Sequence, residues 1–173
     1  MSLFNVILLY QKRQAYNMVI SILGLDKNKT EVLVKELNVL LANFQIYYQN
    51  VRGLHWNIKG KNFFELHLKF EEFYTDAQEK VDLIAERILT LQGTPLHTFR
   101  DYESLASVPV GKDISNDEQA VKLIVASLVE LLKIERVILS LSDEAGDEGT
   151  NSMMSDFISE QEKTLWMMNA WLG

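Results

Sequence analysis

Residues 55–87 read HWNIKGKNFFELHLKFEEFYTDAQEKVDLIAER and hold two of the chain's three histidines. Each residue of an α-helix turns about 100° and rises about 1.5 Å. Glu71 therefore lies one turn after His67 and about 40° from it around a helix. Asp82 and Glu86 lie further along, at about 60° and 100° from His67. One narrow edge of the predicted helix thus carries an imidazole and three carboxylates.

The other residues of this predicted helix divide into two faces. Apolar side chains occupy the sector next to the acidic edge, and charged side chains occupy the opposite sector. We expect the first set to face the core and the second to face water. The core set is Phe63, Phe70, Tyr74, Ala77, Val81, Ile84 and Ile88, and the water-facing set is Glu65, Lys69, Glu72, Asp76, Lys80 and Arg87.

The two halves of the acidic edge lie too far apart for one chain to close a metal site. His67 and Asp82 are separated by about 22 Å along a straight helix, whereas ligands lie about 2 Å from a metal ion. If two copies of the helix pack antiparallel about a twofold axis, the His67 end of one lies beside the Asp82 end of the other. The sequence therefore predicts two identical metal centres shared across a homodimer interface.

His55 fits this arrangement because it precedes a turn-like segment, Asn57–Gly60. In a helical hairpin, His55 and His67 flank the same bend and converge. Two imidazoles and three carboxylates make a mixed nitrogen and oxygen ligand set, which suits iron or zinc. The chain has no cysteine, so disulfides and thiolate metal sites are excluded.

The pattern resembles that of the Dps proteins, the mini-ferritins named DNA-binding proteins from starved cells. That family has a His-Trp pair on its first helix, a second His twelve residues later, an acid four residues on, and an Asp-x-x-x-Glu pair further along. The matching residues here are His55-Trp56, His67, Glu71, Asp82 and Glu86. One departure is Glu71, where the family usually has Asp. Its longer side chain puts the occupancy of a second iron position in question.

The resemblance implies an iron-storing ferroxidase. It implies that His55, His67 and Glu71 of one chain bind iron together with Asp82 and Glu86 of the partner subunit. The same residues would then be catalytic, with hydrogen peroxide preferred over dioxygen as the oxidant. The resemblance further implies a hollow dodecamer that stores ferric mineral in the cytoplasm and protects the cell from oxidative damage.

Two acids outside this edge are candidates for a second role. Asp147 and Glu148 belong to an acidic, glycine-bearing stretch, Asp143–Gly149. The simplest interpretation of this stretch is a solvated loop. In a Dps-like shell, the corresponding region lies near threefold pores through which cations enter, so either acid is a candidate to line such a pore.

Apolar residues recur at helical spacing in four long segments. We expect helices at about 30–57 and 62–92, a third that Ser115–Glu118 opens as a capping box, and a fourth at about 150–171. A short helix near 101–106 should lie in the long connection between the second and third. The predicted fold is all-α, a ferritin-like four-helix bundle with one crossover. We expect residues 29–173 to form this domain and residues 1–28 to form a flexible extension.

Charge and composition limit the other functions. The net charge is −7 and the first 26 residues contain only Lys12 and Arg13 as basic residues before the predicted bundle. Phosphate binding requires clustered positive charge, so we expect weak or no DNA binding. One alternative is a DNA-compacting stress protein in which iron oxidation is secondary, and another is a helical module whose acidic edge is only a polar dimer contact. No run of eighteen apolar residues is present, so no membrane span is expected.

Overall fold

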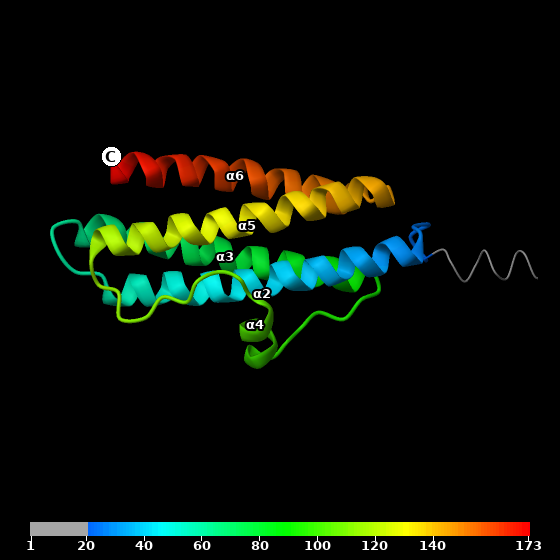
Figure 1. Ribbon diagram of the computed structural model, residues 1–173, viewed down its shortest axis with the longest axis horizontal. Helices are drawn as coiled ribbons and strands as arrows, with labels where there is room; N and C mark the ends of the chain where they lie inside the picture. The colour runs from blue at the N-terminus through cyan, green and yellow to red at the C-terminus, as the bar shows by residue number, and fades with distance from the viewer. Residues whose placement is uncertain (1–20) are drawn as a thin grey trace, which may run out of the picture.

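The computed structural model describes residues 21–173, and within this range all regular structure is helical (Figure 1). Four long helices lie side by side as a bundle, and one short helix lies outside it in the connection between the second and third long helices. The predicted all-α fold with an extra helix in the crossover is therefore confirmed. The helices are α2 (Lys27–Asn57), α3 (Phe63–Thr90), α4 (Phe99–Leu105), α5 (Asp117–Ala145) and α6 (Glu148–Leu172).

Most of the predicted extension, residues 1–20, lies outside the described residues. The first described helix, α2, begins at Lys27, three residues before the predicted start. Asp26 caps it, since its side chain accepts hydrogen bonds from the backbone N–H groups of Asn28 (2.9 Å) and Lys29 (3.2 Å). None of the described helices is long and apolar enough to cross a membrane.

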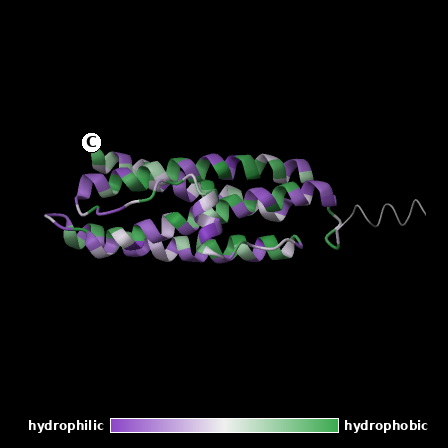
Figure 2. Ribbon diagram, turned by 60° about the horizontal axis from the view of Figure 1, so that its bottom comes forward, coloured by the Kyte–Doolittle hydropathy of each residue, from purple (hydrophilic) through white to green (hydrophobic). Residues whose placement is uncertain are grey.

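The core runs along the axis of the bundle. In Figure 2, hydrophobic and hydrophilic residues alternate along each long helix, as amphipathic packing requires. Helix α2 packs closely against α3 and α5, and α5 packs closely against α6. Burial of each large apolar side chain contributes about 1.5–3 kcal/mol to stability. The largest fully buried side chains include Phe44, Phe70, Leu33, Leu37, Leu40, Ile84, Ile88, Ile124 and Leu128.

Asparagines of α2 hold the crossover against the bundle. The Asn43 Oδ1 accepts hydrogen bonds from the backbone N–H groups of Ser107 (2.8 Å) and Val108 (2.9 Å). Asn50 accepts one from Gly111 N–H (2.9 Å) and donates one to a carbonyl of the same segment. These bonds satisfy backbone groups that no helix or sheet can satisfy. The connection therefore follows the outer side of α2.

The predicted capping box at Ser115–Glu118 differs from the structure, and the start of α3 has no side-chain cap. Asn62 stands at the N-cap position of α3, but its side chain donates to Asp117 Oδ2 (2.8 Å) and makes no capping bond. Helix α5 is capped by Asn116, one residue later than predicted. The reason is that the Ser115 carbonyl accepts a hydrogen bond from Lys59 N–H (3.0 Å), which holds Ser115 in the preceding connection.

Two residues that we expected to face water turn inward. Phe70, Ala77, Ile84 and Ile88 of α3 are buried as predicted, but Lys80 is only 4% exposed. Its ammonium bonds to Asp76 and to Glu160 of α6. Arg87 likewise turns towards α6. Helix α6 covers this side of α3, so long basic side chains fill the space between the two helices and keep their charges bonded.

Candidate metal centre

His55 and His67 come together at the bend between α2 and α3. Their rings stack with centroids 3.8 Å apart and planes at 19°. Each ring bonds to the backbone of the other residue: His55 Nδ1 lies 2.8 Å from the His67 carbonyl oxygen, and His67 Nδ1 lies 2.8 Å from the His55 carbonyl oxygen. The predicted convergence of the two histidines is confirmed.

This reciprocal bonding fixes the tautomer of both rings. A carbonyl oxygen only accepts hydrogen bonds, so each Nδ1 must carry the proton and donate. In a neutral imidazole, the lone pair then lies on Nε2. Metal-binding histidines in proteins are held by such a bond from the ring nitrogen that does not bind the metal. Both rings are therefore prepared to coordinate a cation through Nε2.

Aromatic rings hold the two imidazoles in place. The Phe63 ring stacks on His67 at 5.1 Å and 21°, and the Tyr74 ring meets His55 edge-on at 5.3 Å. The Tyr74 hydroxyl donates to Glu71 Oε1 over 3.4 Å. Loss of hydration and the Glu71 carboxylate raise the pKa of Tyr74, so the phenol remains a donor at neutral pH. Tyr74 thus contacts both Glu71 and the His55 ring.

The other two predicted ligands lie at the far end of α3. Asp82 and Glu86 are exposed, as is Glu71. Helix α3 runs without interruption from Phe63 to Thr90, so the separation of about 22 Å expected from helical rise holds. Within residues 21–173 of one chain, no three His, Asp or Glu side chains gather closely enough to hold a metal ion. One chain therefore supplies two separate halves, and their union between two copies stays a prediction.

Exposed apolar side chains share this face of α3. Phe64 is 80% exposed, Leu68 is 60% exposed and Leu89 is 58% exposed. On the helical wheel they lie within the same sector as the three acids. Trp56 of α2 is also exposed, with the Arg52 guanidinium 4.8 Å above its ring. Exposed apolar groups of this size, interleaved with charges, are typical of a protein contact surface.

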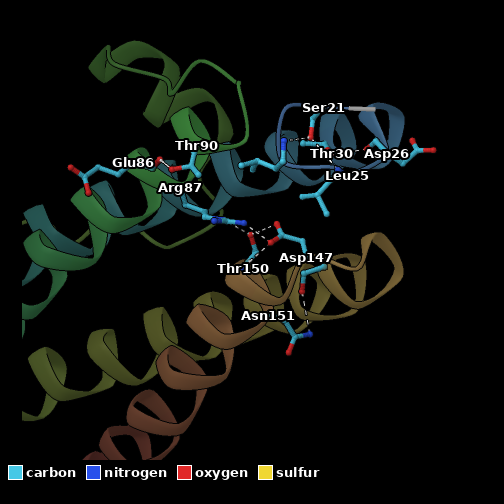
Figure 3. Close-up of polar contacts among 12 residues, drawn as sticks. Ser21, Leu25, Asp26, Thr30, Glu86, Arg87, Thr90, Asp147, Thr150 and Asn151 are labelled. Carbon is cyan, nitrogen blue, oxygen red and sulfur yellow. Dashed lines mark hydrogen bonds and ion pairs between the residues drawn. The ribbon is translucent and has the colours of Figure 1, made fainter. Parts of the chain in front are cut away.

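Arg87 points away from the acidic edge and clamps α3 to the start of α6 (Figure 3). Its Nε donates to Thr150 Oγ1 (2.9 Å) and its Nη2 forms an ion pair with Asp147. Asp147 is also the N-cap of α6, accepting from the Thr150 N–H (3.2 Å) and hydroxyl (2.6 Å). In Figure 3, Glu86 lies on the opposite side of α3 from this cluster.

This clamp changes the interpretation of the acidic stretch. The Asp147 side chain is only 2% exposed, so its carboxylate is not free to line a pore, contrary to the sequence-based expectation. Glu148 is exposed and remains a pore candidate. Asp143 lies in the last turn of α5, and not in a loop. The spacing Asp147-x-x-Thr150 is an N-cap signal that could have identified this role from the sequence.

Comparisons with known proteins agree with this architecture. A family model described as a ferritin-like domain matches residues 34–173. The DNA protection during starvation protein of Porphyromonas gingivalis is 39% identical over 153 residues, which are 88% of this chain and 96% of that protein. The chain belongs to the Dps branch of the ferritin-like family. The resemblance inferred from residues 55–87 is confirmed.

Solved structures of Dps proteins share the fold. The Dps protein of Vibrio cholerae O1, described as a member of a broad superfamily of ferritin-like diiron-carboxylate proteins, superposes with a TM-score of 0.88 at 49% identity. The alignment covers 90% of this chain and 98% of that one. The Dps protein of Bacillus brevis gives a TM-score of 0.82 at 34% identity and covers 84% of this chain and 98% of that one.

Proposed function

We propose that this Dps-family chain oxidises Fe(II) at centres formed between two copies and stores the ferric product inside a closed assembly. The reciprocal His55 and His67 pair carries the proposal. The Nδ1 bonds to backbone carbonyls leave an Nε2 lone pair on each of the two rings, and Glu71, Asp82 and Glu86 follow along the same edge of α3. Imidazole nitrogens and carboxylate oxygens, without thiolates, suit Fe(II) as the substrate.

The shared centre follows from an antiparallel pairing of α3. A second copy turned by a twofold axis brings Asp82 and Glu86 of the partner subunit to the His55 and His67 end. The same pairing would cover the exposed apolar side chains of α3. Isologous contact makes two equivalent centres for each pair of subunits. We propose a hollow dodecamer as the complete assembly.

Each ligand type has a separate task in the proposed reaction. The imidazoles of His55 and His67 hold Fe(II) in place. The carboxylates of Glu71 and, across the interface, Asp82 and Glu86 stabilise the higher charge of Fe(III). Hydrogen peroxide, the proposed oxidant, takes one electron from each of two Fe(II) ions and two protons, and leaves as two water molecules. No hydroxyl radical is released when both electrons are supplied together.

Protection of the cell would come from this removal of Fe(II) and peroxide. The Porphyromonas gingivalis relative is named for DNA protection during starvation. For the present chain, we propose protection in the cytoplasm without tight DNA contact, because the net charge of −7 opposes binding to phosphates. This distinguishes it from a DNA-compacting protein in which iron chemistry is secondary.

The test is anaerobic loading of the purified protein with Fe(II), followed by a stoichiometric pulse of hydrogen peroxide. Ferric absorbance and size-exclusion chromatography follow the oxidation and the retention of product. Fast oxidation that the His67→Ala/Asp82→Ala variant loses, and that Glu65→Ala retains, supports the proposal. Glu65 is an exposed acid of the same helix that lies off the acidic edge. Wild-type oxidation no faster than that of free iron would refute it.

A further inference from the structure

The centre of the bundle contains a carboxyl group that the proposed ferroxidase reaction does not use. Glu135 of α5 has 0% exposure, and Gln161 of α6 beside it has 5%. The Gln161 Nε2 donates a hydrogen bond to Glu135 Oε1. The remaining oxygens, Glu135 Oε2 and Gln161 Oε1, have no hydrogen-bond partner among the described residues. Two buried acceptors on neighbouring groups therefore lack a donor.

No neighbouring cation supplies the missing interaction. Lys80 of α3 is the nearest buried ammonium, but its bonds go to Asp76 and Glu160 at the edge of the bundle. Arg136 bonds to the exposed Glu162. An ionised carboxylate left without a partner at 0% exposure would cost several kcal/mol. Among the described residues, no three His, Asp or Glu side chains gather closely enough to hold a metal ion, so the ligand that fits is a proton.

We propose that Glu135 and Gln161 form a proton-binding site that locks α5 to α6. A proton on Glu135 Oε2 turns the carboxylate into a donor directed at the amide oxygen of Gln161. A carboxylic acid and a primary amide then form two hydrogen bonds in a ring, with the acid O–H and the amide N–H as donors. The ring satisfies both unpartnered oxygens and leaves no buried charge on α5.

The Gln161 side of the pair borders a cleft. Gln161 lines a cleft of about 330 Å³ between α3 and α6, together with Tyr47, Asp76 and Glu160. The Tyr47 phenol at this cleft stays un-ionised at neutral pH, because burial raises its pKa. Proton release from Glu135 would leave a buried carboxylate on α5 and remove one of the two bonds to Gln161.

The pKa of Glu135 agrees with this geometry and gives the direction of the effect. Burial raises it from 4.5 to about 7, although Gln161, Lys80 and Arg136 each lower it. An acid with a raised pKa in the folded state stabilises the fold fully below pH 4.5 and loses that contribution as the pH rises to about 7. The corresponding change in the unfolding equilibrium constant is about 300-fold.

Isotope-edited infrared spectroscopy of the assembled protein with labelled glutamate tests the proposal. At about pH 5.5 the wild-type chain should show the carbonyl band of an un-ionised, hydrogen-bonded carboxyl group, and the band should fade as the pH is raised to about 8.5. Glu135→Gln should lack this band, whereas Glu118→Gln, which removes an exposed acid of α5, should keep it. Absence of the band in the wild type, or its persistence in Glu135→Gln, would overturn the proposal.

Thermal unfolding gives a second readout. An amide at position 135 can form the same two bonds to Gln161 at every pH. Glu135→Gln should therefore unfold at the same temperature as the wild type at about pH 4.5 and at a higher temperature at about pH 8. A melting temperature of Glu135→Gln that stays below the wild-type value at both pH values would show that the pair is not protonated, and would reject the proton site.

Discussion

Removal of the Arg87 side chain should destabilise the bundle strongly. In Arg87→Ala, the Asp147 carboxylate stays buried but loses its counter-ion and the clamp between α3 and α6. Breaking a buried ion pair from one side typically costs 3–5 kcal/mol. Arg87 is 19% exposed and Asp147 is 2% exposed, so water reaches the pair from the arginine side. We therefore expect the lower part of this range, about 3 kcal/mol.

Calorimetry of the assembled protein is the measurement. For chains of this size, 1 kcal/mol lowers the melting temperature by about 2–4 °C, so Arg87→Ala should melt roughly 6–12 °C below the wild type. Arg136→Ala is the matched control, because its partner Glu162 is exposed and its side chain is half-exposed. Exposed pairs contribute only about 0–1 kcal/mol.

A third variant separates the charge of the clamp from the helix cap. Asparagine caps helices as well as aspartate does, so Asp147→Asn removes the charge and keeps the cap of α6. Asp147→Asn should destabilise the fold less than Arg87→Ala does. The double variant Arg87→Ala/Asp147→Asn should lose less unfolding free energy than the sum of the two single losses. Equal melting temperatures for Arg87→Ala and Arg136→Ala would refute the assignment of Arg87 as a buried clamp.

Four further substitutions test other contacts. Lys80→Met removes a buried ammonium whose carboxylate partners are half-exposed and can be rehydrated, so the melting temperature should stay within about 3 °C of the wild type or rise. A large fall in the melting temperature of Lys80→Met would contradict this expectation. Gly149→Ala should lower the free energy of unfolding by about 1–3 kcal/mol, because its Cβ would lie 2.9–3.0 Å from the Arg87 guanidinium. Gly53→Ala, with open space at its Cβ, should instead stabilise α2. If the proposed function holds, Glu71→Asp should lower the dissociation constant of the second Fe(II) ion about tenfold in an anaerobic titration. An unchanged dissociation constant would argue against an effect of the longer Glu71 side chain.

Local sequence signals were sufficient to predict the architecture. Apolar spacing and capping residues placed the long helices to within a few residues, because each helix buries a continuous apolar stripe. The turn at Asn57–Gly60 between two helix patterns was enough to bring His55 and His67 together. The mutual Nδ1 bonds of the histidines could not be foreseen, because they depend on the ring orientations that the hairpin and Phe63 impose.

The inward-facing polar groups were not predictable from one helix at a time. Lys80 and Arg87 lie on the polar sector of the α3 wheel, and only the position of α6 makes that sector an interior surface. Asp147 looked like a loop residue because acids surround it in the sequence. Glu135 carries no sequence signal of its own, since an isolated acid within an apolar helix pattern is usually exposed. The burial of these groups depends on contacts between segments that are distant in the sequence.

The central claim is that each metal centre takes its ligands from two subunits, and complementation tests it most directly. His67→Ala and Asp82→Ala chains should each form assemblies without ferroxidase activity. In a mixed pair, one centre carries both substitutions and the other is complete. Random one-to-one co-assembly should therefore restore about one quarter of the wild-type rate of peroxide-driven iron oxidation. Mixed assemblies that stay as inactive as either parent would contradict a centre shared between antiparallel α3 helices.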